Sequence, residues 1–266
     1  MKRSLIALAL ATLAFQAQAA RPWFLPSATQ VEGKEPTVTV DAAVSDNLFE
    51  FDKFALKMDD AQLIQPDGSR QPVTGATAGR LRSVADFKLT QNGTYKLVLA
   101  SRGAMAMFKV NGEMKRVNGT EESIAKDVPK DAEDLRIILQ HQRIETYFTA
   151  NAPSNGAFKP TGEGLELVPI THPTELHEGD KARFRFLLDG KPAANLAFSL
   201  IPGGVRYRGV LNERRLTTDA NGEASITLPE PGMYWLNASL PAAGGPPQPG
   251  TTRRYIYAAT LEILPQ

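Results

Sequence analysis

Short apolar or alternating segments, separated by clusters of glycine, proline, asparagine and aspartate, make up most of this chain. Residues 36–41 alternate apolar and polar side chains, and residues 182–188 set two phenylalanines against two arginines in the same way. A period of two places the apolar side chains on one face of a strand. In the second half, turn residues recur about every 8–12 positions, which is typical of a β-sandwich. The pattern predicts an all-β fold.

Turn residues mark where several of these strands end. Residues 65–69 read Gln-Pro-Asp-Gly-Ser, where proline presets φ and Gly68 accepts a positive φ. Residues 111–112 are Asn-Gly, a signal for a tight turn. Between these turns we expect a strand over residues 92–99 and a hairpin partner for it over residues 104–109.

The segment from residue 121 to residue 150 departs from this pattern, because charged and apolar residues mix there with few turn residues. Leu135, Ile138 and Leu139 fall near helical spacing, whereas the residues from 143 to 149 are β-branched and aromatic. We expect a short helix or loop near residues 121–133, followed by a strand over residues 134–149.

A glycine- and proline-rich stretch at residues 150–164 is the best candidate for a linker. We therefore expect two β-sandwich-like domains. Residues 20–164 would form an N-terminal, mainly-β domain that carries the helix or loop insertion. Residues 165–266 would form a C-terminal sandwich of the Ig-like type, similar to carboxypeptidase-regulatory-like modules.

The first nineteen residues have the pattern of a secretory signal peptide. Lys2 and Arg3 precede an apolar run over residues 5–15, and Ala17-Gln18-Ala19 offers small residues to a signal peptidase. The sequence thus predicts export, a mature chain that begins at Ala20, and a periplasmic location. No second apolar stretch approaches the roughly 20 residues of a membrane helix, so we expect no stable membrane insertion.

Composition narrows the classes of function. The net charge is +1, which favours neither nucleic acid nor an anionic membrane as a partner. The chain has no cysteine, which excludes thiol nucleophiles, cysteine-ligated zinc and iron–sulfur clusters. The apolar fraction of 42% is sufficient for cores without disulfides. No phosphate loop, nucleophile elbow or zincin motif is present, so we expect a protein that is not an enzyme.

Two patches of sequence, in a fixed order, carry a resemblance. The first is Arg-Pro-Trp-Phe-Leu-Pro-Ser at residues 21–27 with Phe-Glu-Phe-Asp at 49–52; the second comprises residues 165–170, 172–173, 178–180, 189–192 and 217–222. Together they resemble the DUF4198 family, whose members are periplasmic and resemble the periplasmic component of nickel and cobalt uptake systems. The resemblance implies two sandwich-like parts and a link to transition-metal acquisition.

Members of that family often carry a histidine just before the Trp-x-x-Pro stretch, where an amine and a ring nitrogen could hold a metal. This chain has Ala20-Arg21-Pro22 at that place, and an arginine does not ligate a cation. The missing histidine therefore strengthens the alternative of an interaction module without a metal site.

Three histidines supply the candidates for such a site. His172, Glu175 and His177 lie within one loop, with His141 as a partner through space, and this set suits a divalent transition metal such as Ni, Co, Cu or Zn. The alternative is a solvated loop in which His172 fixes a turn. Met105 and Met107 share a strand face and would suit Cu(I), but methionine also fills cores.

A basic hairpin is the candidate for docking. It would present Arg206, Arg208, Arg214 and Arg215 to an anionic ligand or partner. The leading hypothesis is a non-enzymatic periplasmic accessory protein for uptake of nickel, cobalt or chelated iron. It would act by binding the metal or by docking to a transporter or receptor. The alternatives are a structural or interaction module with no metal site, and a carbohydrate- or peptide-binding module with an aromatic platform.

Overall fold

The computed structural model describes residues 20–241 and 250–266. The predicted signal peptide, residues 1–19, lies outside the described residues. The rest of the chain is dominated by strands, which confirms the all-β prediction. In the described part of the chain, no helix has both the length and the apolar character needed to cross a membrane.

One long sheet forms the centre of the molecule. Its order is β16-β15-β18-β19-β11-β9-β5-β6, with β10 beside β9 and β2 beside β11. Its pairs are antiparallel except β11 with β19 and β11 with β2, which are parallel. The strands are β2 (Gln30–Val31), β5 (Gln62–Ile64), β6 (Arg70–Pro72), β9 (Gly93–Val110), β10 (Glu113–Gly119), β11 (Glu133–Ala150), β15 (Ala197–Pro202), β16 (Arg214–Thr217), β18 (Gly232–Leu240) and β19 (Gly250–Ile263).

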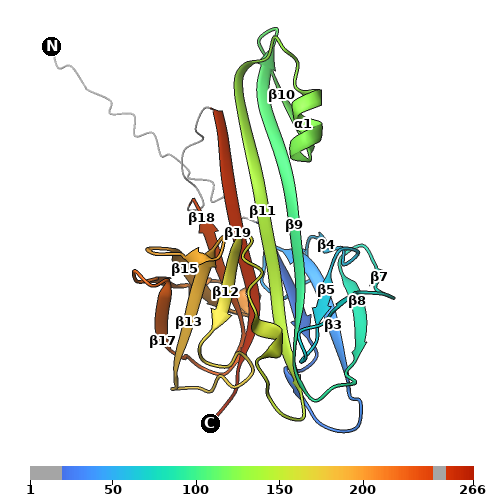
Figure 1. The fold of residues 1–266 in the computed structure, drawn as a ribbon, viewed down its shortest axis with the longest axis vertical. Coiled ribbons are helices and arrows are strands. Elements are labelled where there is room, and N and C mark those ends of the chain that lie inside the picture. The colour runs from blue at the N-terminus through green and yellow to red at the C-terminus, as the bar shows by residue number, and fades with distance from the viewer. Residues whose placement is uncertain (1–19, 242–249) are drawn as a thin grey trace, which may run out of the picture.

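Two smaller sheets cover this long sheet. In Figure 1 the N-terminal strands lie to the right of β11 and the C-terminal strands to its left. The N-terminal sheet contains β1 (Arg21–Pro26), β3 (Thr37–Ser45), β4 (Phe54–Ala55), β7 (Thr77–Ala78) and β8 (Ser83–Lys88). The C-terminal sheet contains β12 (Leu165–Pro169), β13 (Lys181–Leu188), β14 (Lys191–Pro192) and β17 (Glu223–Thr227).

The alternation of side chains along β9 and β11 places the two small sheets on opposite faces of the long sheet. Leu97 and Phe148 pack into the N-terminal core, whereas their neighbours Val98 and Tyr147 pack into the C-terminal core. Successive residues of a strand point to opposite faces, so each of these strands contributes to both cores. The two sandwiches therefore share one sheet, and β19 of the C-terminal half pairs with β11 of the N-terminal half.

Beyond the sandwiches, β9 and β11 continue into a projection that we call the arm (residues 103–140), visible at the top of Figure 1. The arm also contains β10 and α1 (Glu121–Asp127). Thr120 caps α1, since its hydroxyl accepts from the Ser123 backbone N–H at 3.1 Å. The helix ends at Val128, whose position before a proline disfavours helical backbone. The expected helix insertion and the strand after it are both confirmed.

The predicted hairpin between residues 92–99 and 104–109 is wrong, because β9 is one strand of 18 residues. The apolar pattern is interrupted at Ser101, Arg102 and Gly103. Each of these residues nevertheless pairs with a residue of β11. The turn falls later, at Asn111 and Gly112, where both residues have positive φ. Pairing with a strand distant in sequence outweighs the local glycine signal.

Two short helical segments complete the fold. One is η1 (Gly156–Phe158), which lies in the predicted linker and buries Ala157 and Phe158 in the C-terminal core. The other is α2 (Val205–Arg208).

Candidate functional site

His172 is half-buried, and both of its ring nitrogens contact polar groups of the protein. Nε2 lies 3.1 Å from the Thr94 hydroxyl and 3.1 Å from the Ser154 carbonyl oxygen. Nδ1 lies 3.2 Å from the Thr174 hydroxyl, and the ring packs against Phe158 with centroids 5.2 Å apart. A ligating nitrogen needs a free lone pair, so this ring does not fit a metal site. It joins the residue 172–174 turn to β9.

The other members of the loop do not complete a ligand set. Glu175 lies 3.8 Å from His172 and is exposed, while His177 enters a backbone bridge with Leu264. Over residues 20–241 and 250–266, no group of three or more histidine, aspartate or glutamate side chains is arranged to hold a metal ion.

Replacing His172 with alanine is expected to lower the free energy of unfolding by about 1–3 kcal/mol, because the buried hydroxyls of Thr94 and Thr174 each lose one of their hydrogen-bond partners. His177→Ala is the matched control and is expected to change stability by less than about 0.5 kcal/mol. Urea unfolding measures both. Equal losses for the two variants would contradict the structural role of His172.

His141 lies far from this loop. It pairs with Arg102 on β9, eight residues along the strand from Thr94, which contacts His172. At about 3.3 Å per residue this separation is roughly 26 Å. The structure therefore does not bring His141 to the loop of His172 and His177.

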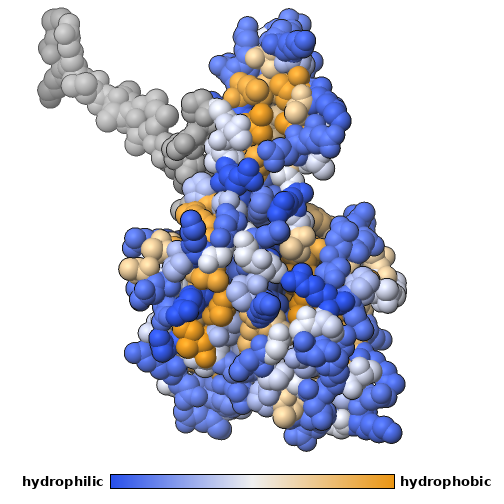
Figure 2. Space-filling view, viewed as in Figure 1, coloured by the Kyte–Doolittle hydropathy of each residue, from blue (hydrophilic) through white to orange (hydrophobic). Residues whose placement is uncertain are grey.

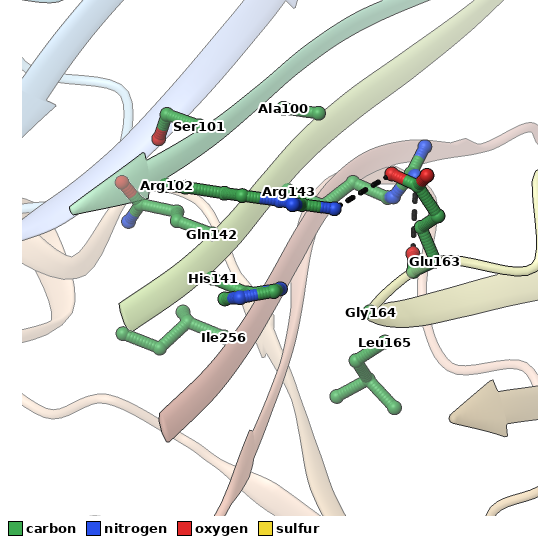
Figure 3. A pocket seen from close by; sticks show the side chains of 10 residues that line it. All are labelled: Ala100, Ser101, Arg102, His141, Gln142, Arg143, Glu163, Gly164, Leu165 and Ile256. Carbon is green, nitrogen blue, oxygen red and sulfur yellow. Dashed lines mark hydrogen bonds and ion pairs between the residues drawn. The ribbon is translucent and has the colours of Figure 1, made fainter. Parts of the chain in front are cut away.

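His141 instead lines a cavity of about 220 Å³ on the face of the long sheet that carries the C-terminal sheet (Figure 3). Its Nε2 lies 3.2 Å from Arg253 Nη1, and its ring contacts Tyr255. Burial, together with the charges of Arg102 and Arg253, lowers the pKa of His141. The ring is thus held neutral, as an acceptor for arginine.

Glu163 closes this cavity on one side. Arg102 donates to its carboxylate at 2.9 Å, and Arg143 donates to its backbone carbonyl at 3.4 Å, as the dashed lines in Figure 3 show. Both arginines are therefore engaged with the protein. Ser101 and His141 both line this cavity, but among the described residues no hydrogen bond joins them as it would join a nucleophile to its base.

Beneath the cavity, Glu145 forms the centre of a buried ionic cluster on the long sheet. Its side chain is 1% exposed and lies 3.3 Å from Arg143 and 3.6 Å from Lys96. The hydroxyls of Tyr147 and Tyr257 donate to it at 2.8 and 2.7 Å. All of these groups come from the central strands β9, β11 and β19.

Glu166 completes the cluster from β12. Its carboxylate lies 3.4 Å from Arg143 and accepts from Thr161 at 2.9 Å and from the Gly162 backbone N–H at 2.8 Å. Two buried carboxylates therefore face two buried cations. The cluster ties the C-terminal sheet to the shared sheet.

Burial alone would raise the pKa of Glu145, but the charges of Lys96 and Arg143 and the tyrosine hydrogen bonds lower it overall. Burial and the Glu145 charge raise the pKa of Tyr147 well above its ordinary value. Neither group exchanges a proton near neutral pH, as an acid–base catalyst must. The cluster stabilises charge within the fold.

The predicted basic hairpin does not form, because Arg206 and Arg208 lie on the helix α2, whereas Arg214 and Arg215 lie on β16. Gly204 and Gly209, both in the left-handed region, bracket that helix. Arg208 donates to the carbonyls of Gly203 and Pro202, the second at 3.0 Å. The remaining arginines of the set point elsewhere: Arg206 lies 3.7 Å from Glu50, Arg215 lies 2.9 Å from Glu213, and Arg214 precedes it on β16.

Sequence reasoning missed the buried ionic cluster. Arg143 and Glu145 alternate with apolar residues on β11, a pattern typical of a strand with one face in water. The pattern itself contains no sign that a second sheet covers the charged face. Only the three-dimensional structure shows that Arg143 and Glu145 are buried and that Lys96 and Glu166 join them.

The fold defines an all-β protein of two β-sandwiches that share one sheet. The family model for DUF4198, described as a domain of unknown function, matches residues 17–242. The chain therefore belongs to the DUF4198 family, as the two sequence patches indicate. A search of curated proteins finds no match.

A search of solved structures returns distant matches. The human OSCAR ligand-binding domain is 14% identical, with 91% of this chain and 97% of that chain covered and a TM-score of 0.23. The D0–D1 domain of intimin is 13% identical, with 91% and 97% covered and a TM-score of 0.24. The fibronectin(III)-like modules of Clostridium thermocellum CbhA are 8% identical, with 91% and 94% covered and a TM-score of 0.22. With TM-scores this low, these likenesses carry no conclusion about fold or function.

Proposed function

We propose that this protein is an exported, non-enzymatic accessory protein that docks to a partner protein through the arm. The observation that carries the proposal is the arm itself, which projects from the two sandwiches and contributes nothing to their cores. It has a small core of its own, formed by Ala104, Ala106, Phe108, Ile124 and Leu139. Because the arm does not pack into the sandwich cores, it does not stabilise them. Binding of a partner is the role that accounts for the arm.

One face of the arm is suited to this role. Ala106 and Phe108 on β9 face α1, so Met105 and Met107 lie on the opposite face. In the register of the strands, Met105 is paired with Ile138, and Met107 stands between Arg116 and Arg136. We call this surface the methionine–arginine face. Figure 2 shows that the arm exposes apolar groups in this view.

The charge of this face indicates the chemistry of the partner. Within the described part of the chain, neither Arg116 nor Arg136 forms an ion pair, and Met114 beside them is 58% exposed. Methionine and arginine are enriched in protein interfaces, where methionine adapts its shape to a partner. An acidic protein surface with apolar residues complements this face. The family resemblance to nickel and cobalt uptake systems favours a metal-uptake transporter as that partner.

A photo-crosslinking amino acid at position 107 tests this proposal in the source cell. We expect one defined protein adduct from position 107 and none from position 115, because Lys115 lies on the same strand pair but faces the helix side. The adduct identifies the partner, which is then purified for a direct binding measurement.

In that binding measurement, the double variant Arg116→Glu/Arg136→Glu is expected to weaken affinity by about tenfold or more. Lys115→Glu is the matched control and is expected to leave affinity within about twofold. Unchanged affinity of the double variant, or equal crosslinking from positions 107 and 115, would show that the methionine–arginine face is not the docking surface.

A further inference from the structure

A second cavity, of about 420 Å³, lies between the strands β5, β6, β9 and β11 of the long sheet and the segment of residues 156–161. It lies on the same face of the long sheet as the buried ionic cluster, and its lining includes Ile64, Arg70, Lys96, Val98 and Lys159. Cavities that bind small molecules typically have volumes of about 300–1,000 Å³, so this one is large enough for a small ligand. It is separate from the arm, and it shares only Arg143 with the lining of the cavity of His141.

Lys96 is the unusual residue in this cavity. It is only 5% exposed, and its nearest carboxylate oxygen, on Glu145, lies 3.6 Å away, beyond hydrogen-bond distance. Its Nζ donates no hydrogen bond to any residue that the structure describes, while Glu145 is already satisfied by Arg143 and two tyrosines. The ammonium of Lys96 keeps access to the cavity, so a ligand oxygen there could accept the hydrogen bonds that no protein group accepts.

The rim of the cavity adds two further cations. Arg70 and Lys159 are both exposed, and neither forms an ion pair or side-chain hydrogen bond in the described part of the chain. The lining contains one acidic residue, Asp67, whose carboxylate already accepts from the Ser69 backbone N–H at 2.8 Å and from Gln91 at 3.0 Å.

The balance of charge limits the ligand to a monoanion. Lys96 and Arg143 are offset by Glu145 and Glu166 in the buried cluster. At the rim, the two cations exceed Asp67 by one charge. A second negative charge on the ligand would stand beside buried Glu145 without a cation to offset it.

The remaining wall of the cavity is apolar. Ile64, Val98 and Ala157 line it and belong to the C-terminal core, and Pro160 stands beside them. Such a wall favours an organic body over a bare inorganic ion. We propose that this cavity binds a small organic monocarboxylate, with its carboxylate against Lys96 and its apolar body along Val98 and Ala157.

Titration with benzoate, followed by amide chemical shifts of the labelled protein, tests the proposal directly. We expect saturable shifts centred on Val98, Ala157 and Lys96. Benzamide has the same shape without the charge, and its affinity is expected to be lower by a factor of about ten or more. Inorganic phosphate is expected to be weaker than benzoate, since it lacks the apolar body. Equal binding of benzamide, tighter binding of phosphate, or no saturable shift with benzoate would each overturn the proposal.

Variants locate the site. Lys96→Met keeps the apolar stem and is expected to weaken benzoate binding by about tenfold or more. Because this change also leaves Glu145 with one cation fewer, the exposed pair Arg70→Gln/Lys159→Gln provides a second test that spares the fold, with an expected loss of several-fold.

Lys57→Gln is the matched control, since Lys57 is exposed, outside the cavity and free of ion pairs among the described residues. It is expected to leave benzoate binding unchanged. If Lys96→Met folds and binds benzoate as tightly as wild type, the assignment is wrong. If Lys96→Met does not fold, the rim double variant decides, and unaltered benzoate binding by that variant overturns the assignment. None of these results depends on the arm, so they leave the docking proposal to its own test.

Discussion

Replacing Glu145 with glutamine is expected to lower the free energy of unfolding by about 3–5 kcal/mol. The glutamine has nearly the same shape, but it leaves Lys96 and Arg143 buried with only Glu166 to offset them. It also turns a carboxylate that accepts from Tyr147 and Tyr257 into an amide with one acceptor oxygen. Removing one member of a buried ionic cluster exposes the desolvation cost of the members that remain.

Urea unfolding followed by circular dichroism measures this loss. Glu163→Gln is the matched control, because Glu163 also pairs with an arginine, at 2.9 Å, but its side chain is 69% exposed. Exposed pairs contribute about 0–1 kcal/mol, so this control is expected to remain close to wild type. Similar losses in the two variants would show that the burial of Glu145 does not determine its contribution.

The same cluster predicts a dependence of stability on pH. The folded state holds the pKa of Glu145 below its ordinary value of 4.5, since the neighbouring cations and tyrosines outweigh burial. Its contribution to stability is therefore fully present above pH 4.5 and is lost as pH falls through the lowered pKa, because the unfolded chain binds the proton first. Over that acid range, wild type is expected to lose stability more steeply than Glu145→Gln. Parallel curves would contradict this origin.

Replacing Trp23 with alanine is also expected to cost about 3–5 kcal/mol. The indole is fully buried, packs against Phe49 and Phe51 with centroids 5.5 and 5.7 Å away, and donates to the Ser45 hydroxyl at 2.7 Å. It belongs to a core cluster that joins β1 to Trp235 and Ala258 of the C-terminal half. The alanine leaves a cavity and an unpaired hydroxyl at the contact between the two sandwiches.

Because the sandwiches share a sheet and this contact, we expect Trp23→Ala to lower one cooperative transition rather than to separate two. Calorimetry and circular dichroism together test this point. Tyr207→Ala, at an 85% exposed aromatic residue, is the control and is expected to change stability by less than about 0.5 kcal/mol. A loss below about 1 kcal/mol for Trp23→Ala, or two wild-type transitions, would contradict the shared-core description.

Local patterns predicted the features whose causes are local. The turn at Gly68 and the turn at Asn111 and Gly112 lie where the sequence places them, because positive φ is a property of a few neighbouring residues. The helix after Thr120 could be located for a similar reason, since its capping residue and its end before a proline are both in the sequence. The histidine loop shows the limit, because the partners of His172 come from residues 94 and 154.

By itself, the sequence determined the class of fold, the family and several of the strands, since a period of two and turn residues act over short distances. Only the tertiary structure decided that β9 runs unbroken, that β11 and β19 join the two halves, and that Lys96, Arg143, Glu145 and Glu166 meet in the interior. Strand pairing between distant segments leaves no local trace, and a charged strand face looks the same in water as beneath a second sheet. Whether the charged residues of a strand form a buried cluster therefore depends on which other strands cover that face of the sheet.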